Sequence, residues 1–140
     1  MPSSSSMGSD EISPGPSPLI LIVDNDRDNL LLAKYIIESM GINCVTIEDS
    51  QQCLATIEEL VPDLILLDIV MPNLNGIEIV EQIRGNLTTA EIKVIAVTGL
   101  TKVEDRDLLV EAGFDDYLCK PYLIEDLEAK ICRLLDYPLT

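Results

Sequence analysis

Short apolar runs alternate with longer segments of helical period from residue 19 to about residue 135. Polar residues, Pro or Gly bound each run, which is typical of strands buried on both faces of a parallel sheet. The predicted strands are Leu19–Val23, Asn43–Glu48, Leu64–Asp68, Ile92–Val97 and Asp116–Cys119. A helical segment follows each strand, and right-handed crossovers would place helices on both faces of the sheet. The pattern therefore predicts a doubly wound α/β fold with five strands and five helices.

The helical segments carry their own start and stop signals. They cover about residues 24–40, 50–60, 75–85, 101–113 and 123–135. The predicted caps are Ser50, Asn75 with Glu78, and Thr101 with Glu104, and the predicted stops are Gly41, Pro62, Gly85 and Gly113. The apolar side chains expected to face the core are Leu54, Ile57, Leu60, Leu108, Leu109, Leu127, Ile131 and Leu134.

Residues 1–18 differ in composition from the rest of the chain. They contain seven serines and four prolines, with few apolar side chains. Such a segment cannot bury enough apolar surface to offset the entropy lost on ordering, so we expect a disordered N-terminal tail. A linker or an artificial extension would have the same composition. The remaining length suits one domain, which we expect to span residues 19–137.

The formal charge narrows the classes of partner. With 25 acidic and 9 basic side chains the net charge is −16, which argues against direct contact with nucleic acid or an anionic membrane surface. No apolar run reaches the ~20 residues of a membrane span, and the N-terminus lacks a basic segment followed by an apolar one. The four cysteines show no CxxC spacing and histidine is absent, so a zinc site is not expected. Buried free thiols and a cytoplasmic location are expected instead.

Polar side chains follow four of the predicted strands. Asp24, Asn25 and Asp26 come after the first strand, and Asp68 ends the third. Thr98 and Lys120 follow the fourth and fifth strands. Because the carboxyl ends of parallel strands meet at one edge, these side chains should lie together. Carboxylate oxygens suit Mg²⁺, a lysine and a threonine can hold phosphoryl oxygens, and Asp68 could act as a carboxylate nucleophile that forms an acyl phosphate.

Four motifs occur in order at these strand ends: IVDND at 22–26, LLDIVMPNLNG at 66–76, VTG at 97–99 and YLCKP at 117–121. Together they make residues 19 to about 135 resemble a response-regulator receiver domain of two-component signalling, similar to the single-domain chemotaxis regulators. The resemblance implies a flavodoxin-like fold with strand order 2-1-3-4-5. It also implies a phosphorylation switch charged by a sensor histidine kinase or phosphotransfer protein, with a downstream protein as target.

The resemblance assigns a role to each site residue. By that assignment Asp68 is the phosphoacceptor, Asp24 and Asn25 form the metal-binding pair, the Val70 backbone carbonyl completes the Mg²⁺ site, Thr98 is the switch hydroxyl, Tyr117 the switch aromatic, and Lys120 the phosphate-binding lysine. A cis peptide before Pro121 is also implied. Thr98 and Lys120 thereby assist a self-catalysed phosphotransfer and autodephosphorylation, and no further enzyme activity is expected.

One position departs from the family pattern, because the second member of the metal pair is usually acidic and here is Asn25. An amide oxygen can ligate Mg²⁺ but lacks the charge. A phosphorylation-independent pseudo-receiver is therefore an alternative. An aspartyl-phosphate phosphatase or an FMN protein is a further, less favoured alternative. The sequence lacks two features that such a protein would need: a second acid two residues after Asp68 and a phosphate loop after the first strand.

Most of these residues also have a structural reading, although the convergence of Asp68 with Lys120 and Asp24 favours function. Asp24 and Asp26 could be acids at a helix N-terminus, Lys120 a surface charge, and Tyr117 ordinary packing. Thr98 could bond locally at its strand end. The chain ends about where the fifth helix does, so either the output passes through protein contacts or the sequence is a piece of a longer regulator. A homodimer through the last two helices is one form such contacts could take.

Overall fold

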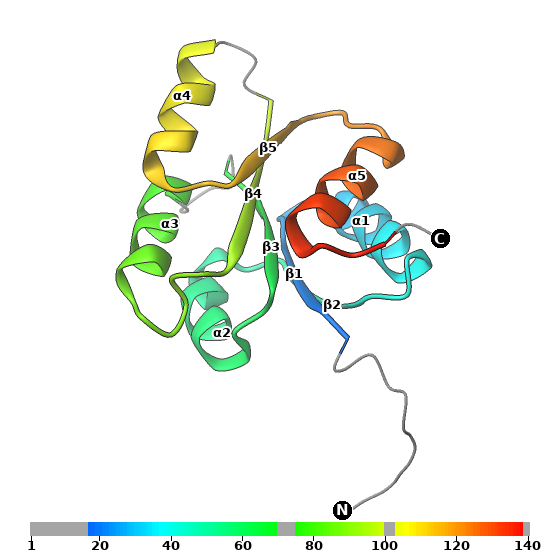
Figure 1. Cartoon of the computed structure of the whole chain (residues 1–140), viewed down its shortest axis with the longest axis horizontal. Helices are drawn as coiled ribbons and strands as arrows, with labels where there is room; N and C mark the ends of the chain where they lie inside the picture. The colour runs from blue at the N-terminus through cyan, green and yellow to red at the C-terminus, as the bar shows by residue number, and fades with distance from the viewer. Residues whose placement is uncertain (1–16, 70–74, 100–102, 139–140) are drawn as a thin grey trace, which may run out of the picture.

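The fold is a five-stranded parallel sheet with helices on both faces, as the sequence predicts (Figure 1). The structure, a computed structural model, describes residues 17–69, 75–99 and 103–138. Along the chain it contains β1 (Leu19–Val23), α1 (Arg27–Ser39), β2 (Asn43–Ile47), a 3₁₀ turn η2 (Ser50–Gln52), α2 (Cys53–Leu60), β3 (Leu64–Asp68), α3 (Gly76–Gly85), β4 (Lys93–Thr98), α4 (Val103–Ala112), β5 (Asp116–Cys119) and α5 (Ile124–Leu135). The strand order β2-β1-β3-β4-β5 confirms the flavodoxin-like topology.

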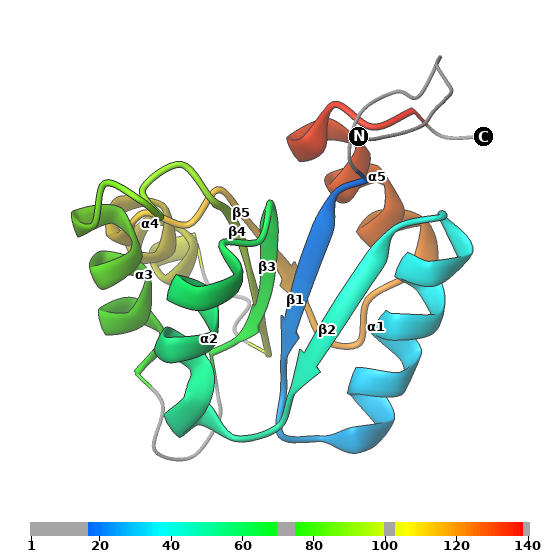
Figure 2. The ribbon, with the colours of Figure 1, turned by 90° about the horizontal axis from the view of Figure 1, so that it is seen from below.

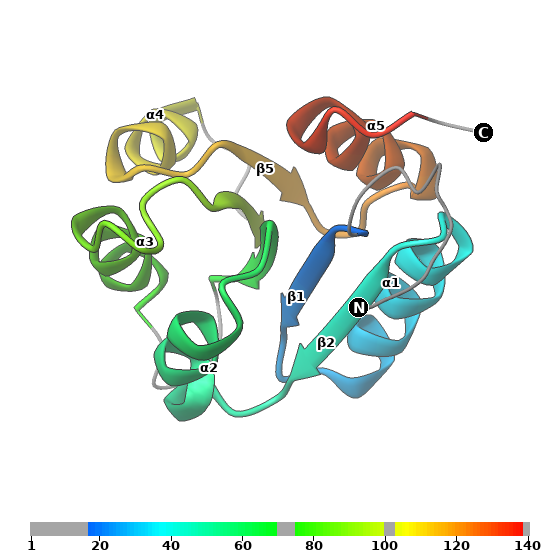
Figure 3. The same cartoon turned by 60° about the horizontal axis from the view of Figure 1, so that its bottom comes forward.

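Two apolar layers hold the sheet, one on each face. Successive strand residues point to opposite faces, so Leu21 and Ile65 join one layer while Ile20 and Leu64 join the other. The first layer packs under α2, α3 and α4, and the second under α1 and α5 (Figures 2 and 3). All five residues of β3 are buried. Burying each large aliphatic side chain contributes about 1.5–3 kcal/mol, so the central strand is the best-anchored part of the sheet.

The predicted strand bounds need only small changes. Observed and predicted bounds agree for β1, β3 and β5, whereas β2 ends one residue earlier, at Ile47, and β4 runs one residue later, over Lys93–Thr98. This last shift makes Thr98 the final residue of β4 instead of the residue after it. Its backbone is thereby held by the ladder with β5, in which Thr98 lies opposite Cys119.

Side-chain caps begin α1 and α3, and one predicted cap is wrong. Asn75 caps α3, accepting hydrogen bonds from the amides of Ile77 (3.1 Å) and Glu78 (3.2 Å). Ser50 is not the cap of the second helix. Instead, η2 precedes α2: Asp49 caps η2, accepting from the Gln51 amide at 2.9 Å, and the N-cap of α2 is Gln52, whose side chain makes no capping hydrogen bond. A carboxylate one residue earlier in the chain accepts the hydrogen bond as well as a hydroxyl does. Thr101 and most of the predicted tail lie outside the described residues.

Two predicted core positions are also wrong. Leu60 ends α2 with 37% of its surface exposed, and Leu108 on α4 is 51% exposed. Leu108 and Val110 flank the buried Leu109, and of these three neighbours α4 turns only Leu109 into the apolar layer. None of the four cysteines forms a disulfide, but the prediction that their thiols are buried is correct only for Cys53. Burial raises the pKa of the Cys53 thiol to about 11.

The end of α5 is joined to the end of α1. Asp136 adopts a left-handed conformation (φ 52°), which turns the chain so that the Tyr137 hydroxyl donates to the Met40 carbonyl at 2.9 Å. Gly41, with φ +83°, lies under this contact, and a Cβ there would come within 3.4 Å of the same hydroxyl. The contact therefore ties residues 97 positions apart in the sequence.

We expect Tyr137→Phe to lower the free energy of unfolding by about 1 kcal/mol, because the Met40 carbonyl loses a donor that a phenyl ring cannot supply. Urea unfolding followed by circular dichroism measures the change. Tyr35→Phe is the matched control, since Tyr35 on α1 is 70% exposed. Equal unfolding midpoints for the two variants would show that the Tyr137 contact contributes nothing.

Candidate functional site

The sheet brings the predicted site residues to one edge. Asp68 is the last residue of β3 and Thr98 the last of β4, while Asp24 and Lys120 follow β1 and β5 directly. The backbone ladder continues past the strands, with the Asp24 amide donating to Ile47 (3.1 Å) and the Lys120 amide to Thr98 (2.8 Å). These bonds fix where the side chains begin. The Lys120–Pro121 peptide is cis, as the family resemblance implies.

Lys120 bridges the two buried acids. Its Nζ lies 2.9 Å from Oδ2 of Asp68 and 3.4 Å from Oδ2 of Asp24. The side chains of Asp68 and Asp24 are only 5% and 8% exposed, against 29% for Lys120. The geometry excludes the reading of Lys120 as a free surface charge. It also brings together three residues from strands that are distant in the sequence.

The two acids after β1, Asp24 and Asp26, have different contacts. Asp26 is the N-cap of α1, and its carboxylate accepts from the amides of Asp28 (2.9 Å) and Asn29 (3.3 Å). The structural reading of Asp26 is therefore correct. Asp24 instead turns toward the site, with its Oδ1 accepting from the Asp26 amide at 2.9 Å and its Oδ2 facing Lys120. Asn25, between them, is exposed.

The charges of the site act on one another. Burial raises the pKa of Asp24, the hydrogen bond from the Asp26 amide opposes this, and the nearby charge of Asp68 raises it further. For Lys120, burial alone would lower the pKa, but hydrogen bonds and charges from Asp68 and Asp24 outweigh burial, so its pKa is raised. The lysine therefore stays charged and neutralises part of the negative charge of the pair.

The two residues that the resemblance names as switches lie in different surroundings. Thr98 is 1% exposed, at the same sheet edge as Asp68. Tyr117 on β5 is half-buried, and its ring centroid lies 5.3 Å from Arg106 Cζ of α4 and 5.7 Å from Lys130 Nζ of α5. A cation over an aromatic face is attractive. Sequence reasoning missed both cations, because nothing in their local pattern indicates the contact. Val70 lies outside the described residues.

Tyr122 is another neighbour that sequence reasoning missed. Burial and the charge of Asp24 raise the pKa of its phenol, with Lys120 opposing. Together with Asn29, Leu32, Lys120 and Pro121 it lines a pocket of about 340 Å³. Its position directly after the Lys-Pro pair is the only signal in the sequence that could have indicated it.

The donor set can be tested against Mg²⁺. Within the described part of the chain, no group of three or more His, Cys, Asp or Glu side chains could hold a metal ion. Mg²⁺ keeps several waters and needs only one or two carboxylates, so Asp24 and Asp68 meet its minimum. Their buried, mutually repelling oxygens are hard ligands that a divalent cation would stabilise. The residues therefore fit Mg²⁺.

Comparisons with known proteins agree with this geometry. Residues 20–132 match the family model of the response regulator receiver domain. The transcriptional regulatory protein CpxR of Klebsiella pneumoniae subsp. pneumoniae (strain HS11286) is 39% identical over 116 residues, 83% of this chain and 48% of that protein. The chain thus spans about half the length of the curated relatives it matches.

Solved structures give the same result. A CheY-like response regulator receiver domain protein from Methanospirillum hungatei JF-1 is 34% identical with a TM-score of 0.79, covering 86% of this chain and 95% of that one. The receiver domain of sensor histidine kinase PA1611 from Pseudomonas aeruginosa PAO1 is 26% identical with a TM-score of 0.77, covering 86% and 99%. That structure is described with a magnesium ion coordinated in the active site cleft.

The strand order and the lysine-bridged carboxylates define a flavodoxin-like α/β protein with a charged site at the carboxyl edge of its sheet. The match over residues 20–132 shows the family: the chain belongs to the response regulator receiver domains of two-component systems. The resemblance read from the four motifs is confirmed. In the part of the chain that the structure describes, no helix is both long and apolar enough to cross a membrane.

We expect Lys120→Met to lower the free energy of unfolding by about 2 kcal/mol, because two buried carboxylates would lose their shared cation. The cost is less than for a fully buried pair, since the lysine is 29% exposed. Urea unfolding without divalent cations measures it. Lys34→Met on the exposed face of α1 is the control. A Lys120→Met variant as stable as this control would contradict the bridging role.

Proposed function

We propose that the protein is a phosphorylation switch in which Asp68 accepts a phosphoryl group from a sensor histidine kinase or a phosphotransfer protein. Receiver domains interact with such donors, and they are signalling proteins and not classical enzymes. The observation that carries the proposal is the 2.9 Å contact between Lys120 Nζ and Asp68 at the buried end of β3. An acid directly after four buried aliphatics gains nothing from packing, so its burial beside a lysine favours a chemical role over a structural one.

The proposed transfer gives each of these groups a chemical role. An Asp68 oxygen attacks phosphorus, a P–O bond forms, and the P–N bond to the donor imidazole breaks, with its electron pair remaining on the imidazole nitrogen. Lys120 Nζ neutralises negative charge on the phosphoryl oxygens, and the Thr98 hydroxyl donates to one of them. Asp24, Asn25, Asp68 and the Val70 carbonyl would hold Mg²⁺, which supplies further charge neutralisation when bound. Hydrolysis of the acyl phosphate by the same groups would reset the switch.

The signal would leave the site through Thr98 and Tyr117. A Thr98 hydroxyl that moves toward a phosphoryl oxygen would free space for the Tyr117 ring to turn. The ring now contacts Arg106 and Lys130, so its turning would rearrange charged groups on α4 and α5. A downstream protein, or a second copy of the chain, would bind the altered surface. Curated relatives are named transcriptional regulators, so control of transcription is one downstream outcome. Four cysteines without a disulfide favour the reducing cytoplasm as the place of action.

A second candidate function rests on Asn25. This side chain is neutral and exposed at the position where the family usually has an acid. With Asp24 and Asp68 as the carboxylates that meet in the described part of the site, metal affinity could fall too low for phosphorylation. The chain would then be a pseudo-receiver, which keeps the fold as an interaction module.

Incubation with acetyl phosphate and Mg²⁺, followed by intact-mass measurement, tests the acceptor. Wild type should gain the mass of one phosphoryl group, and Asp68→Asn should gain none, because an amide is not a nucleophile toward phosphorus. Asp26→Asn is the matched control, since Asp26 caps α1 and should not affect labelling. Labelling of Asp68→Asn at the wild-type level would show that another residue is the acceptor.

A titration of labelling rate against Mg²⁺ tests Asn25. We expect Asn25→Asp to reach half-maximal rate at a lower Mg²⁺ concentration, by about tenfold, because a charged ligand is added for a cation that sheds water reluctantly. The two curves should converge when metal saturates. Coincident curves at every concentration would place Asn25 away from the metal. Labelling of Asn25→Asp alone would favour the pseudo-receiver.

A further inference from the structure

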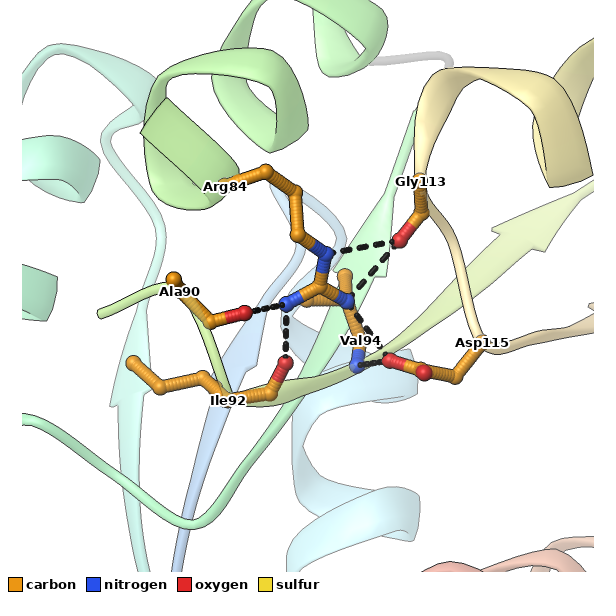
Figure 4. Close-up of polar contacts among 6 residues, drawn as sticks. All are labelled: Arg84, Ala90, Ile92, Val94, Gly113 and Asp115. Carbon is orange, nitrogen blue, oxygen red and sulfur yellow. Dashed lines mark hydrogen bonds and ion pairs between the residues drawn. The ribbon is translucent and has the colours of Figure 1, made fainter. Parts of the chain in front are cut away.

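The Arg84 side chain, in the last turn of α3, makes five hydrogen bonds away from the site. Its Nε and Nη2 donate to the Gly113 carbonyl at 3.0 and 2.8 Å, and Nη1 donates to the carbonyls of Ala90 (2.9 Å) and Ile92 (2.6 Å). Nη2 also pairs with Asp115 Oδ2 at 2.7 Å (Figure 4). These contacts use all five N–H donors of the guanidinium. We call Arg84, Ala90, Ile92, Gly113 and Asp115 the Arg84 clamp.

Asp115 extends the clamp into the sheet. The Oδ2 atom that pairs with Arg84 also accepts from the Val94 amide at 2.8 Å, and the Asp115 amide donates to the Val94 carbonyl at 2.9 Å. Arg84 and Asp115 side chains are 26% and 27% exposed, so water screens the pair only in part. A planar fork is needed for this pattern, and a lysine ammonium could not reach the same acceptors together.

Gly113 is the point where the clamp holds α4. The helix ends in a Schellman motif, with the Gly113 amide donating to Val110 and the Phe114 amide to Leu109, both at 3.1 Å. Gly113 has φ +119°, and a Cβ there would come within 3.1 Å of Arg84 Cγ. The glycine therefore allows both the turn and the close approach of the arginine to the last carbonyl of the motif.

Among the described side chains of α4, residues 106–112, burial is confined to the last turn. Leu109 is 2% exposed and Ala112 half-buried, whereas Leu108 and Val110 are 51% and 62% exposed. Arg106, nearer the start of the helix, is exposed and touches the Tyr117 ring. Firm attachment, in the described part of the helix, thus lies at its carboxyl end.

The two ends of β4 lie at two different polar clusters. Thr98 ends the strand at the charged site, and Ile92 and Val94 lie at its start beside the clamp. Five residue steps separate the ends of β4, which is roughly 16 Å along the strand. Chain connectivity brings α4 from the Thr98 end back to the clamp, because α4 begins at Val103 and Gly113 follows its last residue.

We propose that the Arg84 clamp is the fixed pivot of α4: it holds the carboxyl end of the helix against α3, β4 and β5, so that a change at Thr98 moves the amino-terminal half of the helix alone. The signalling part of this inference rests on the proposed function. The pivot itself is a property of the unmodified fold. Without the clamp, the packing of Leu109 and Ala112 would remain, and a change at Thr98 would shift the carboxyl end of the helix as well.

Amide hydrogen exchange, followed by NMR on the full chain, tests the pivot. In the unphosphorylated Arg84→Lys variant, we expect the Gly113 and Phe114 amides to exchange about tenfold faster than in wild type, because the clamp loses most of its donors. Amides of β1 and α5 should keep their wild-type rates. Asp115→Asn, which retains an acceptor for Val94, should give a smaller change at the same amides. Arg27→Lys is the matched control, since Arg27 forms an exposed 3.4 Å pair with Glu48.

A second arm adds acetyl phosphate and Mg²⁺. In wild type, exchange should change around Arg106 but not at Gly113 and Phe114, and in Arg84→Lys the change should extend to both. Uniformly faster exchange across the whole sheet in Arg84→Lys, or unchanged rates at Gly113 and Phe114, would overturn the pivot. A donor-induced change at Gly113 in wild type as large as that at Arg106 would do so too. If the donor adds no phosphoryl mass, the proposed function fails, and the unmodified arm still decides the pivot.

Discussion

Burial of two carboxylates at one edge of the sheet is the constraint on which the rest of the structure depends. Asp68 and Asp24 are 5% and 8% exposed, and an unpaired buried charge would cost several kcal/mol. Lys120 offsets that cost by lying within reach of both. The arrangement requires β1, β3 and β5 to end at the same edge, because each carries one of the three groups. The charge balance of the site therefore depends on the topology of the sheet.

The opposite edge of the sheet has another kind of polar cluster. At the charged site, two acids share one cation, so an added phosphoryl group or metal ion changes the balance of forces. In the Arg84 clamp, every guanidinium donor already has an acceptor, and most of these are neutral carbonyls. Because all its donors are already bonded, the clamp gains no new hydrogen bond by rearranging when charge is added at the far end of β4. One end of the sheet can thus respond while the other holds still.

Much of this follows from local sequence. The apolar runs of the strands predict a doubly wound sheet, since four consecutive aliphatics such as Leu64–Leu67, repeated in alternation with helical segments, are typical of strands covered on both faces. The Asn75 cap and the Gly113 stop are likewise local, because each depends on hydrogen bonds within a few residues. Placing Asp24, Asp68 and Lys120 at one edge needs only the rule that parallel strands end together.

Other features were decided by tertiary structure alone. Asp49 and Ser50 are both good caps by type, and the path of the chain after β2 selects the first. The exposure of Leu60 and Leu108 depends on how much of each helix its neighbours cover. The acceptors of Arg84 lie 6 to 31 positions away, and the Tyr117 ring meets cations from two helices. Side chains as long and mobile as arginine and lysine find their partners only once the backbone has brought distant carbonyls and rings within reach, so no local pattern encodes those contacts.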